Sequence, residues 1–154
     1  MIFRPFQKIL IANRGEISCR VARTAKAMEM DLAALPLVEH AIVCGDRRPY
    51  LAALITLNAG ALAPFAARCG LAQNDPRLED AIRRELQSGI DAINARHARA
   101  ETIRRFAILP QPLSIEAGDL TPTMKVRRAA VLKRFQPVID ELYQQGAEER
   151  GLAS

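Results

Sequence analysis

A lysine in a short threonine-rich loop is the part of this chain best suited to chemistry. Lys125 lies within GDLTPTMKVRRAAVLKRF, residues 118–135, just before a basic amphipathic segment. Its ammonium is a compact charge on a flexible stem, and Thr121 and Thr123 add hydroxyls. Such a loop can offer charge-assisted hydrogen bonds to the carboxylate and phosphate oxygens of an acyl-phosphate-like group. A solvated loop lysine before a basic helix remains an open alternative, because short motifs match by chance.

Other charged residues near the loop have a functional and a plainer interpretation. Arg127 and Arg128 follow the lysine closely enough to help attract phosphate groups. Asp119 and Glu116 could orient the loop, although simple turn polarity also explains them. The spacing of Arg127 and Arg134 predicts a solvated helix face.

The segments before the loop predict a small sheet. Residues 40–44 and 50–57 are apolar runs joined by GDRRP, whose Gly, Asp and Pro favour a turn, so they are expected to pair as a hairpin. Residues 103–109 form a further strand-like run that stops at Pro110.

Two helices are expected between the hairpin and the third strand. Asn58 can cap a short helix that ends near Gly70, and Asp75 followed by Pro76 is typical of a second helix start. The second helix carries one apolar stripe, formed by Leu78, Ile82, Leu86, Ile90 and Ile93.

The two ends of the chain are predicted as follows. Residues 8–12 favour a buried strand, and a helix over 16–28 presents an apolar face. Apolar spacing over 126–143 predicts a helix that is broken or kinked at Pro137. The polar segment 144–154 is expected to fray. The face of the first helix is formed by Ile17, Val21, Ala25 and Met28, which should pack on the hairpin.

Composition fits one small globular domain. The chain has 154 residues, 49% of them hydrophobic and 25% charged, which allows one real core. The net charge of +5 permits weak polyanion binding, but no nucleic-acid partner is expected because no RNP, KH or helix-turn-helix signal is present. No apolar run is long enough to span a bilayer and no signal peptide is recognisable, so a cytoplasmic location is expected.

The cysteines and histidines favour no metal site. Cys19, Cys44 and Cys69 are an odd number at wide spacing among apolar neighbours, which predicts buried reduced thiols. His40 and His97 are too far apart for a recognisable zinc pattern.

Residues 35–143 resemble the C-terminal subdomain of AMP-forming acyl-CoA synthetases, most closely the long-chain fatty acid-CoA ligases. The resemblance rests on LPLVEHAIVCGDRRPYLAALITLN and on AETIRRFAILPQPLSIEAGDLTPTMKVRRAAVLKRFQPVIDELY, in the family's order. It implies an α+β fold with a small mixed sheet, a hairpin and packed helices. It also implies that Lys125 is the adenylation lysine, with Thr121, Thr123, Arg127 and Arg128 as candidate substrate or phosphate contacts. Many relatives carry a glycine where this chain has Met124.

A shorter resemblance covers the first thirty residues. FQKILIANRGEISCRVARTAKAM is similar to the first strand and helix of biotin carboxylases. No ATP-grasp glycine-rich loop and no biotin-accepting segment follow it. The expected organisation is therefore a carboxylase-like β-α fragment over 1–34, the ligase-like subdomain over 35–143 and a polar tail over 144–154.

Three classes of function stay open on these grounds. The ligase resemblance implies use of ATP or AMP, magnesium, CoA and a fatty acid, but the large domain that holds them in the family has no counterpart in this sequence. The first class is therefore a ligase lid subdomain that is inactive alone. The second is a biotin carboxylase-like, ATP-dependent fragment, and the third is a non-enzymatic basic interaction module. Self-association through exposed apolar surface is a further expectation if the first helix leaves its apolar face uncovered.

Overall fold

The computed structural model describes residues 20–152, which form helices on both faces of a small sheet. The described part of the chain begins with helical residues 20–33, here called the N-terminal helix. The elements that follow are β1 (Val38–Cys44), β2 (Leu51–Leu57), α2 (Ala59–Arg68), α3 (Arg77–Asn94), the 3-10 turn η1 (Arg99–Glu101), β3 (Ile103–Ile108), α4 (Arg128–Arg134) and α5 (Gln136–Leu152).

The three strands are arranged in the order β1-β2-β3. The predicted hairpin is confirmed, because β1 and β2 pair antiparallel with Val43 opposite Ala53. β2 and β3 run parallel, with Ala53 opposite Phe106. The central strand β2 lies between β1 and β3. Six of its seven residues are buried, as expected for a strand covered on both faces of the sheet.

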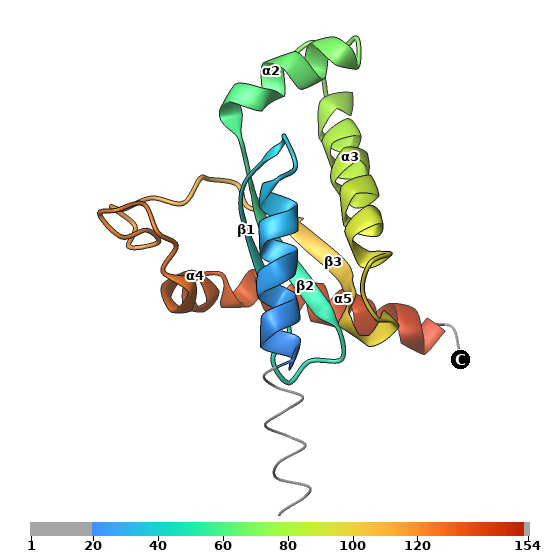
Figure 1. Cartoon of the computed structure of the whole chain (residues 1–154). Coiled ribbons are helices and arrows are strands. Elements are labelled where there is room, and N and C mark those ends of the chain that lie inside the picture. The colour runs from blue at the N-terminus through green and yellow to red at the C-terminus, as the bar shows by residue number, and fades with distance from the viewer. Residues whose placement is uncertain (1–19, 153–154) are drawn as a thin grey trace, which may run out of the picture.

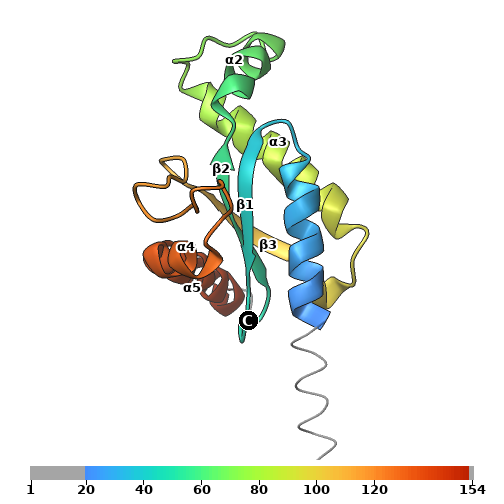
Figure 2. The ribbon, with the colours of Figure 1, turned by 60° about the vertical axis from the view of Figure 1, so that its left-hand side comes forward.

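Helices cover the two faces of the sheet in separate layers (Figures 1 and 2). The N-terminal helix and α3 lie on one face, while α4 and α5 lie on the other. A long loop leads from β3 to α4 and projects from the side of the sheet away from α3 (Figure 1). The expected α+β architecture with a mixed sheet is therefore confirmed.

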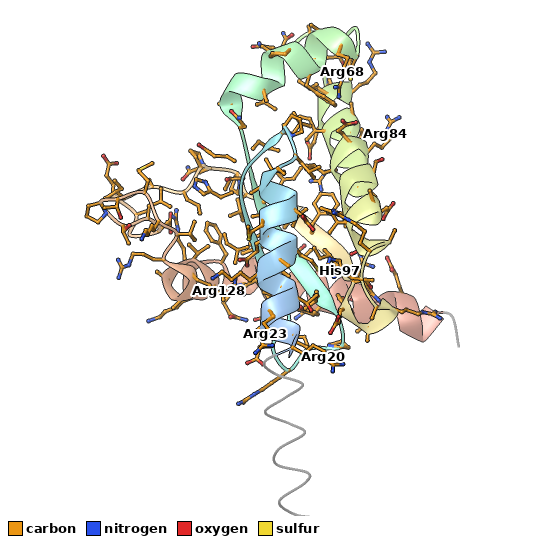
Figure 3. All side chains as sticks on the ribbon, viewed as in Figure 1. Arg20, Arg23, Arg68, Arg84, His97 and Arg128 are labelled. Carbon is orange, nitrogen blue, oxygen red and sulfur yellow. The ribbon has the colours of Figure 1, made fainter. Side chains whose placement is uncertain are left out.

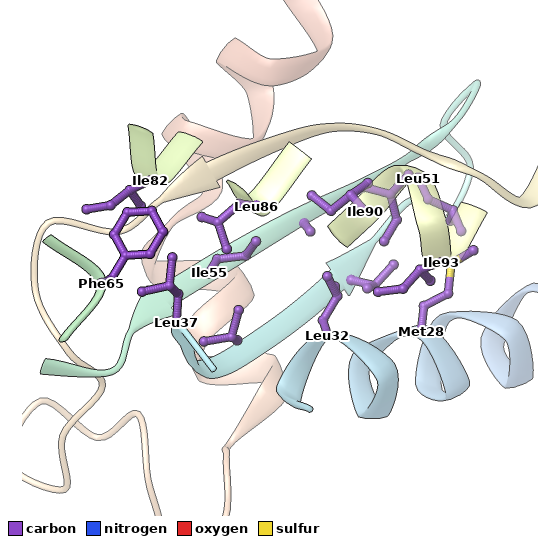
Figure 4. Packing of buried hydrophobic residues seen from close by; sticks show 14 of the residues in the cluster. Met28, Leu32, Leu37, Leu51, Ile55, Phe65, Ile82, Leu86, Ile90 and Ile93 are labelled. Atoms are coloured by element: carbon purple, nitrogen blue, oxygen red, sulfur yellow. The ribbon is translucent and has the colours of Figure 1, made fainter. Parts of the chain in front are cut away.

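The first core lies between the sheet, the N-terminal helix and α3 (Figure 4). All five residues of the predicted α3 stripe are buried. The predicted packing of the first helix on the hairpin is confirmed for its described residues: Ala25 and Met28 are buried in this core and Val21 is partly buried against it. Ile17 and the strand expected over 8–12 lie outside the described residues.

A second core lies beneath α4 and α5 and contains two tyrosines. The Tyr143 hydroxyl lies 3.0 Å from the carbonyl oxygen of Tyr50 and 3.2 Å from that of Cys44. The Tyr50 hydroxyl donates to the carbonyl oxygen of Leu142 at 2.9 Å, and the two rings lie 4.9 Å apart. Burial raises the pKa of Tyr143 well above its usual value, so this phenol stays protonated. These bonds attach α5 to the turn of the hairpin.

The helix ends follow the sequence signals. The Asn58 side chain accepts from the Gly60 amide at 3.0 Å, and Asp75 accepts from the Arg77 amide at 2.9 Å. The predicted break near Pro137 is confirmed, since α4 ends at Arg134 and α5 begins at Gln136.

Two expectations about this part of the chain are wrong. The segment after Gln144 does not fray but continues α5 to Leu152, because Gly146 is buried beside Tyr50 and Glu149 forms an ion pair with Arg105. Cys69 is exposed rather than buried, because it caps α2 at the end of a helix whose buried residues are Phe65 and Ala66.

Candidate functional site

The lysine loop is a tight turn held by its own backbone. Leu120 and Val126 form an isolated antiparallel bridge across its base. The amide of Thr121 donates to the carbonyl oxygen of Lys125 at 2.8 Å, and the amide of Met124 donates to that of Thr121 at 2.8 Å. Met124 has a φ of 62°, in the left-handed region that favours glycine, which gives a physical reason for a glycine at this position in relatives.

The two threonine hydroxyls stabilise the loop itself. The Thr121 hydroxyl accepts from the Lys125 amide at 3.0 Å and lies 3.0 Å from the Thr123 hydroxyl. The Lys125 side chain is exposed and makes no ion pair or side-chain hydrogen bond with any residue in the described range. The loop therefore presents a free ammonium on a defined backbone, with hydroxyls beside it.

An ion pair between a buried carboxylate and a partly exposed arginine anchors the loop. Asp119 is 1% exposed, and its Oδ2 is paired with Nη1 of Arg134 on α4. The backbone carbonyl of Asp119 also accepts from the Arg127 amide at 2.7 Å. Arg134 does not simply line a solvated helix face, as its spacing suggested, because its guanidinium neutralises a carboxylate that would otherwise be buried alone. The suggestion that Asp119 orients the loop gains a geometric basis.

Removal of Arg134 should therefore destabilise the fold. We expect Arg134→Ala to lower the free energy of unfolding by about 2 kcal/mol, below the range for fully buried pairs because the arginine side chain is 38% exposed. Urea unfolding followed by circular dichroism measures the loss. The double variant Asp119→Asn with Arg134→Ala should be more stable than Arg134→Ala alone, since no buried charge is left unpaired. Additive losses would contradict the role assigned to the pair.

The two arginines after the lysine lie in different surroundings. Arg127 is exposed and its Nη1 donates to the carbonyl oxygen of Gly118 at 3.3 Å, so it stays beside the loop. Arg128 instead pairs with Glu29 of the N-terminal helix and donates to the carbonyl oxygen of Val43 (Figure 3). Thus Lys125, Thr121, Thr123 and Arg127 are close along the loop, whereas the Arg128 guanidinium is held against β1.

Cys44 and the possible metal ligands add no reactive group to this site. Burial raises the pKa of the Cys44 thiol, and nearby Arg128 lowers it by less, so the reactive thiolate is disfavoured. Within residues 20–152, no group of three or more His, Cys, Asp or Glu side chains could hold a metal ion. The same part of the chain has no helix that is long and apolar enough to cross a membrane.

The fold and the loop together define a small α+β subdomain that presents a free lysine next to its sheet. The family model described as the AMP-binding enzyme C-terminal domain matches residues 23–147, and the chain belongs to this family. The match begins inside the N-terminal helix, so helix residues after position 23 fall within it. The resemblance expected from residue 35 onward is thereby confirmed at the level of the family.

Two long-chain-fatty-acid–CoA ligases are similar to this chain over part of their length. A long-chain-fatty-acid–CoA ligase of Mycobacterium tuberculosis is 34% identical over 120 residues, which is 75% of this chain and 20% of that protein. A long-chain-fatty-acid–CoA ligase of Bos taurus is 31% identical over 138 residues, or 76% of this chain and 19% of that protein. The chain thus spans about a fifth of the length of these curated relatives.

A solved structure supports the same assignment. The A-PCP didomain of carboxylic acid reductase from Segniliparus rugosus, in complex with AMP, is 27% identical with a TM-score of 0.61. The similarity covers 80% of this chain and 16% of that one. This chain therefore resembles the C-terminal part of AMP-forming ligases and adenylating enzymes in both sequence and fold.

Proposed function

We propose that this chain is the lid subdomain of an AMP-forming long-chain fatty acid-CoA ligase and that Lys125 serves the adenylation step. The observation that carries the proposal is the free Lys125 ammonium on a loop that is anchored by the ion pair between buried Asp119 and Arg134. A side chain of this kind can reach out of its own subdomain while its backbone stays in place. Its charge would stabilise the oxygens of the fatty acid carboxylate and of the ATP α-phosphate as the acyl-adenylate forms.

The remaining loop residues have supporting roles in this proposal. Thr121 and Thr123 fix the loop, and Arg127 adds a positive charge beside it. Arg128 supports the position of α4 through Glu29 rather than contacting phosphate. In this proposal ATP, magnesium, fatty acid and CoA are bound mainly by a large AMP-binding domain, as the family resemblance implies. For magnesium, residues 20–152 contain no group of three or more His, Cys, Asp or Glu side chains that could hold the ion.

The 154-residue chain should form no acyl-adenylate by itself. Most of the rate gain in such a transfer comes from positioning the reactants, and one lysine cannot position ATP and a fatty acid. The chain should also catalyse no ATP-dependent carboxylation, because the sequence has no ATP-grasp glycine-rich loop. A carboxylase-like origin of residues 1–34 stays a proposal that rests on the motif in those residues.

A reconstitution experiment tests this function. The full chain is joined by a flexible linker to the large domain of a long-chain ligase that lacks its own C-terminal subdomain. We expect fatty acid-dependent release of AMP from the fusion at a rate well above the rate of the large domain alone, and none from the 154-residue chain. A fusion no faster than the large domain, or fatty acid-dependent AMP release by the chain alone, would sink the proposal.

A further inference from the structure

An exposed methionine lies directly before Lys125, in the long loop that leads from β3 to α4. Met124 is 61% exposed, and Ile115 on the same loop is 47% exposed. Within residues 20–152, the other large hydrophobic side chain that is exposed is Met30, on the N-terminal helix. The loop that carries Lys125 thus leaves apolar surface uncovered beside the free ammonium.

The backbone of Met124 is held in a conformation that glycine adopts more easily. Its φ of 62° lies in the left-handed region, which strains a residue with a Cβ. The turn is fixed on both sides, because the Met124 amide donates to the Thr121 carbonyl oxygen at 2.8 Å and the Lys125 amide donates to the Thr121 hydroxyl at 3.0 Å. Such strain gathers at functional sites. Neither the strained backbone nor the exposed side chain stabilises this chain, which indicates a role in contact with another surface.

We propose that Met124 is the anchor by which the lysine loop docks into an apolar hollow of the large AMP-binding domain, beside the groups on which Lys125 acts. The inference rests on the proposed function and names the contact partner of the same loop. The chain spans about a fifth of the length of its curated relatives, so most of such a ligase lies outside the part that this chain matches.

The position and chemistry of Met124 fit this partner. Consecutive Cα atoms lie about 3.8 Å apart, so the Met124 side chain comes within reach of the surface around the site that the Lys125 ammonium enters. A methionine side chain is long, unbranched and polarizable, and it adapts to irregular apolar hollows. The large domain therefore offers this side chain the apolar cover that its own subdomain does not supply.

The contact acts on the adenylation step. Met124 touches the large domain only while Lys125 is engaged, so burial of its side chain stabilises the engaged arrangement over the one in which the loop is withdrawn. Met124 is thus a positioning residue: its side chain contacts protein, whereas the Lys125 ammonium contacts the reacting oxygens.

Substitutions at Met124 in the reconstituted fusion test the inference. Met124→Asn removes the apolar side chain but keeps the turn, because asparagine tolerates the left-handed region better than most residues. We expect its kcat for acyl-adenylate formation to fall about tenfold with little change in KM for fatty acid or ATP, the scale expected when most of one methionine side chain is no longer buried. Met124→Leu keeps the apolar volume and should retain the rate within about twofold.

Met30→Asn is the matched control. Met30 is 70% exposed on the N-terminal helix, which covers the opposite face of the sheet from α4 (Figure 2). Its replacement should leave the adenylation rate within about twofold of the parent fusion. Thermal unfolding of the 154-residue chain checks folding: Met124→Asn should melt at the parent temperature or above it, because the turn is less strained and no core residue is changed.

The outcomes separate this inference from the proposed function. A parent fusion no faster than the large domain alone contradicts the proposed function and the inference with it. If the parent fusion is active but Met124→Asn adenylates as fast as the parent, the function stands and the anchoring role is overturned. Equal losses in Met124→Asn and Met124→Leu, or in Met124→Asn and Met30→Asn, also overturn it, because the rate would then not depend on an apolar side chain at this position.

Discussion

Lys125→Ala should reduce the adenylation rate of the reconstituted ligase by roughly a hundredfold or more, the range seen when one preorganised charge-stabilising donor is removed. The loss should fall on acyl-adenylate formation from fatty acid and ATP. Thioester formation from preformed acyl-adenylate and CoA should change far less, because the proposed role places the lysine at the reacting groups in the first step only. Single-turnover assays of the two half-reactions measure this difference.

Lys133→Ala is the matched control for this experiment. Lys133 is an exposed lysine on α4, so its removal deletes the same charge at a nearby place. It should leave both half-reactions almost unchanged. Lys125→Ala should also alter the free energy of unfolding by no more than about 0.5 kcal/mol, as expected of an exposed side chain without partners. Equal losses in the two half-reactions, or a large loss of stability, would assign Lys125 to the scaffold instead.

Gly146→Ala should destabilise the subdomain by about 3 kcal/mol, although alanine is normally the better helix former by about 1 kcal/mol. A Cβ at this position would lie 2.1 Å from the Tyr50 hydroxyl oxygen and 2.9 Å from Cζ of the same ring. Tyr50 cannot easily move, because it is buried and its hydroxyl donates to Leu142. The added methyl group must therefore displace α5 from the hairpin.

Gly151 provides a comparison within the same helix. A Cβ there has no neighbour within 4 Å, so Gly151→Ala should leave stability unchanged or raise it by up to about 1 kcal/mol. Chemical denaturation of both variants measures the change in the free energy of unfolding, which should be a loss for Gly146→Ala and no loss for Gly151→Ala. Adding Tyr50→Phe to Gly146→Ala should recover part of the loss by removing the nearest atom. If the Gly146 and Gly151 variants behaved alike, the close approach of α5 to Tyr50 would be refuted.

The local features of the fold could be predicted because the spacing of apolar residues indicates which face of an element is buried. The α3 stripe from Leu78 to Ile93 repeats at helical spacing, and all of its residues face the first core. Asn58 and Pro137 act on their immediate neighbours, so the cap of α2 and the break before α5 could also be predicted from the sequence. By contrast, the continuation of α5 beyond Gln144 depends on Tyr50 and Arg105, which lie far away in the sequence.

The candidate site could be predicted only in part, for the same reason. Lys125, Thr121 and Thr123 belong to one short motif, and the structure keeps them in one loop. The partners of the arginines could not be inferred. Arg128 pairs with Glu29, which lies 99 positions earlier in the sequence, and the spacing of charged residues on a helix does not indicate such a distant contact.

Both outer strands of the sheet carry side chains in place of a further strand. On β1, the amide of Val43 donates to Glu29 at 2.7 Å, and its carbonyl accepts from Arg128. At the start of β3, Asn94 accepts from the Ile103 amide at 2.9 Å and donates to the Ile103 carbonyl at 2.8 Å. Each pair occupies the backbone groups that a strand of another molecule would need, which is a common protection against aggregation through sheet edges. A three-stranded sheet this small is therefore protected at these two points against pairing with copies of itself into longer sheets.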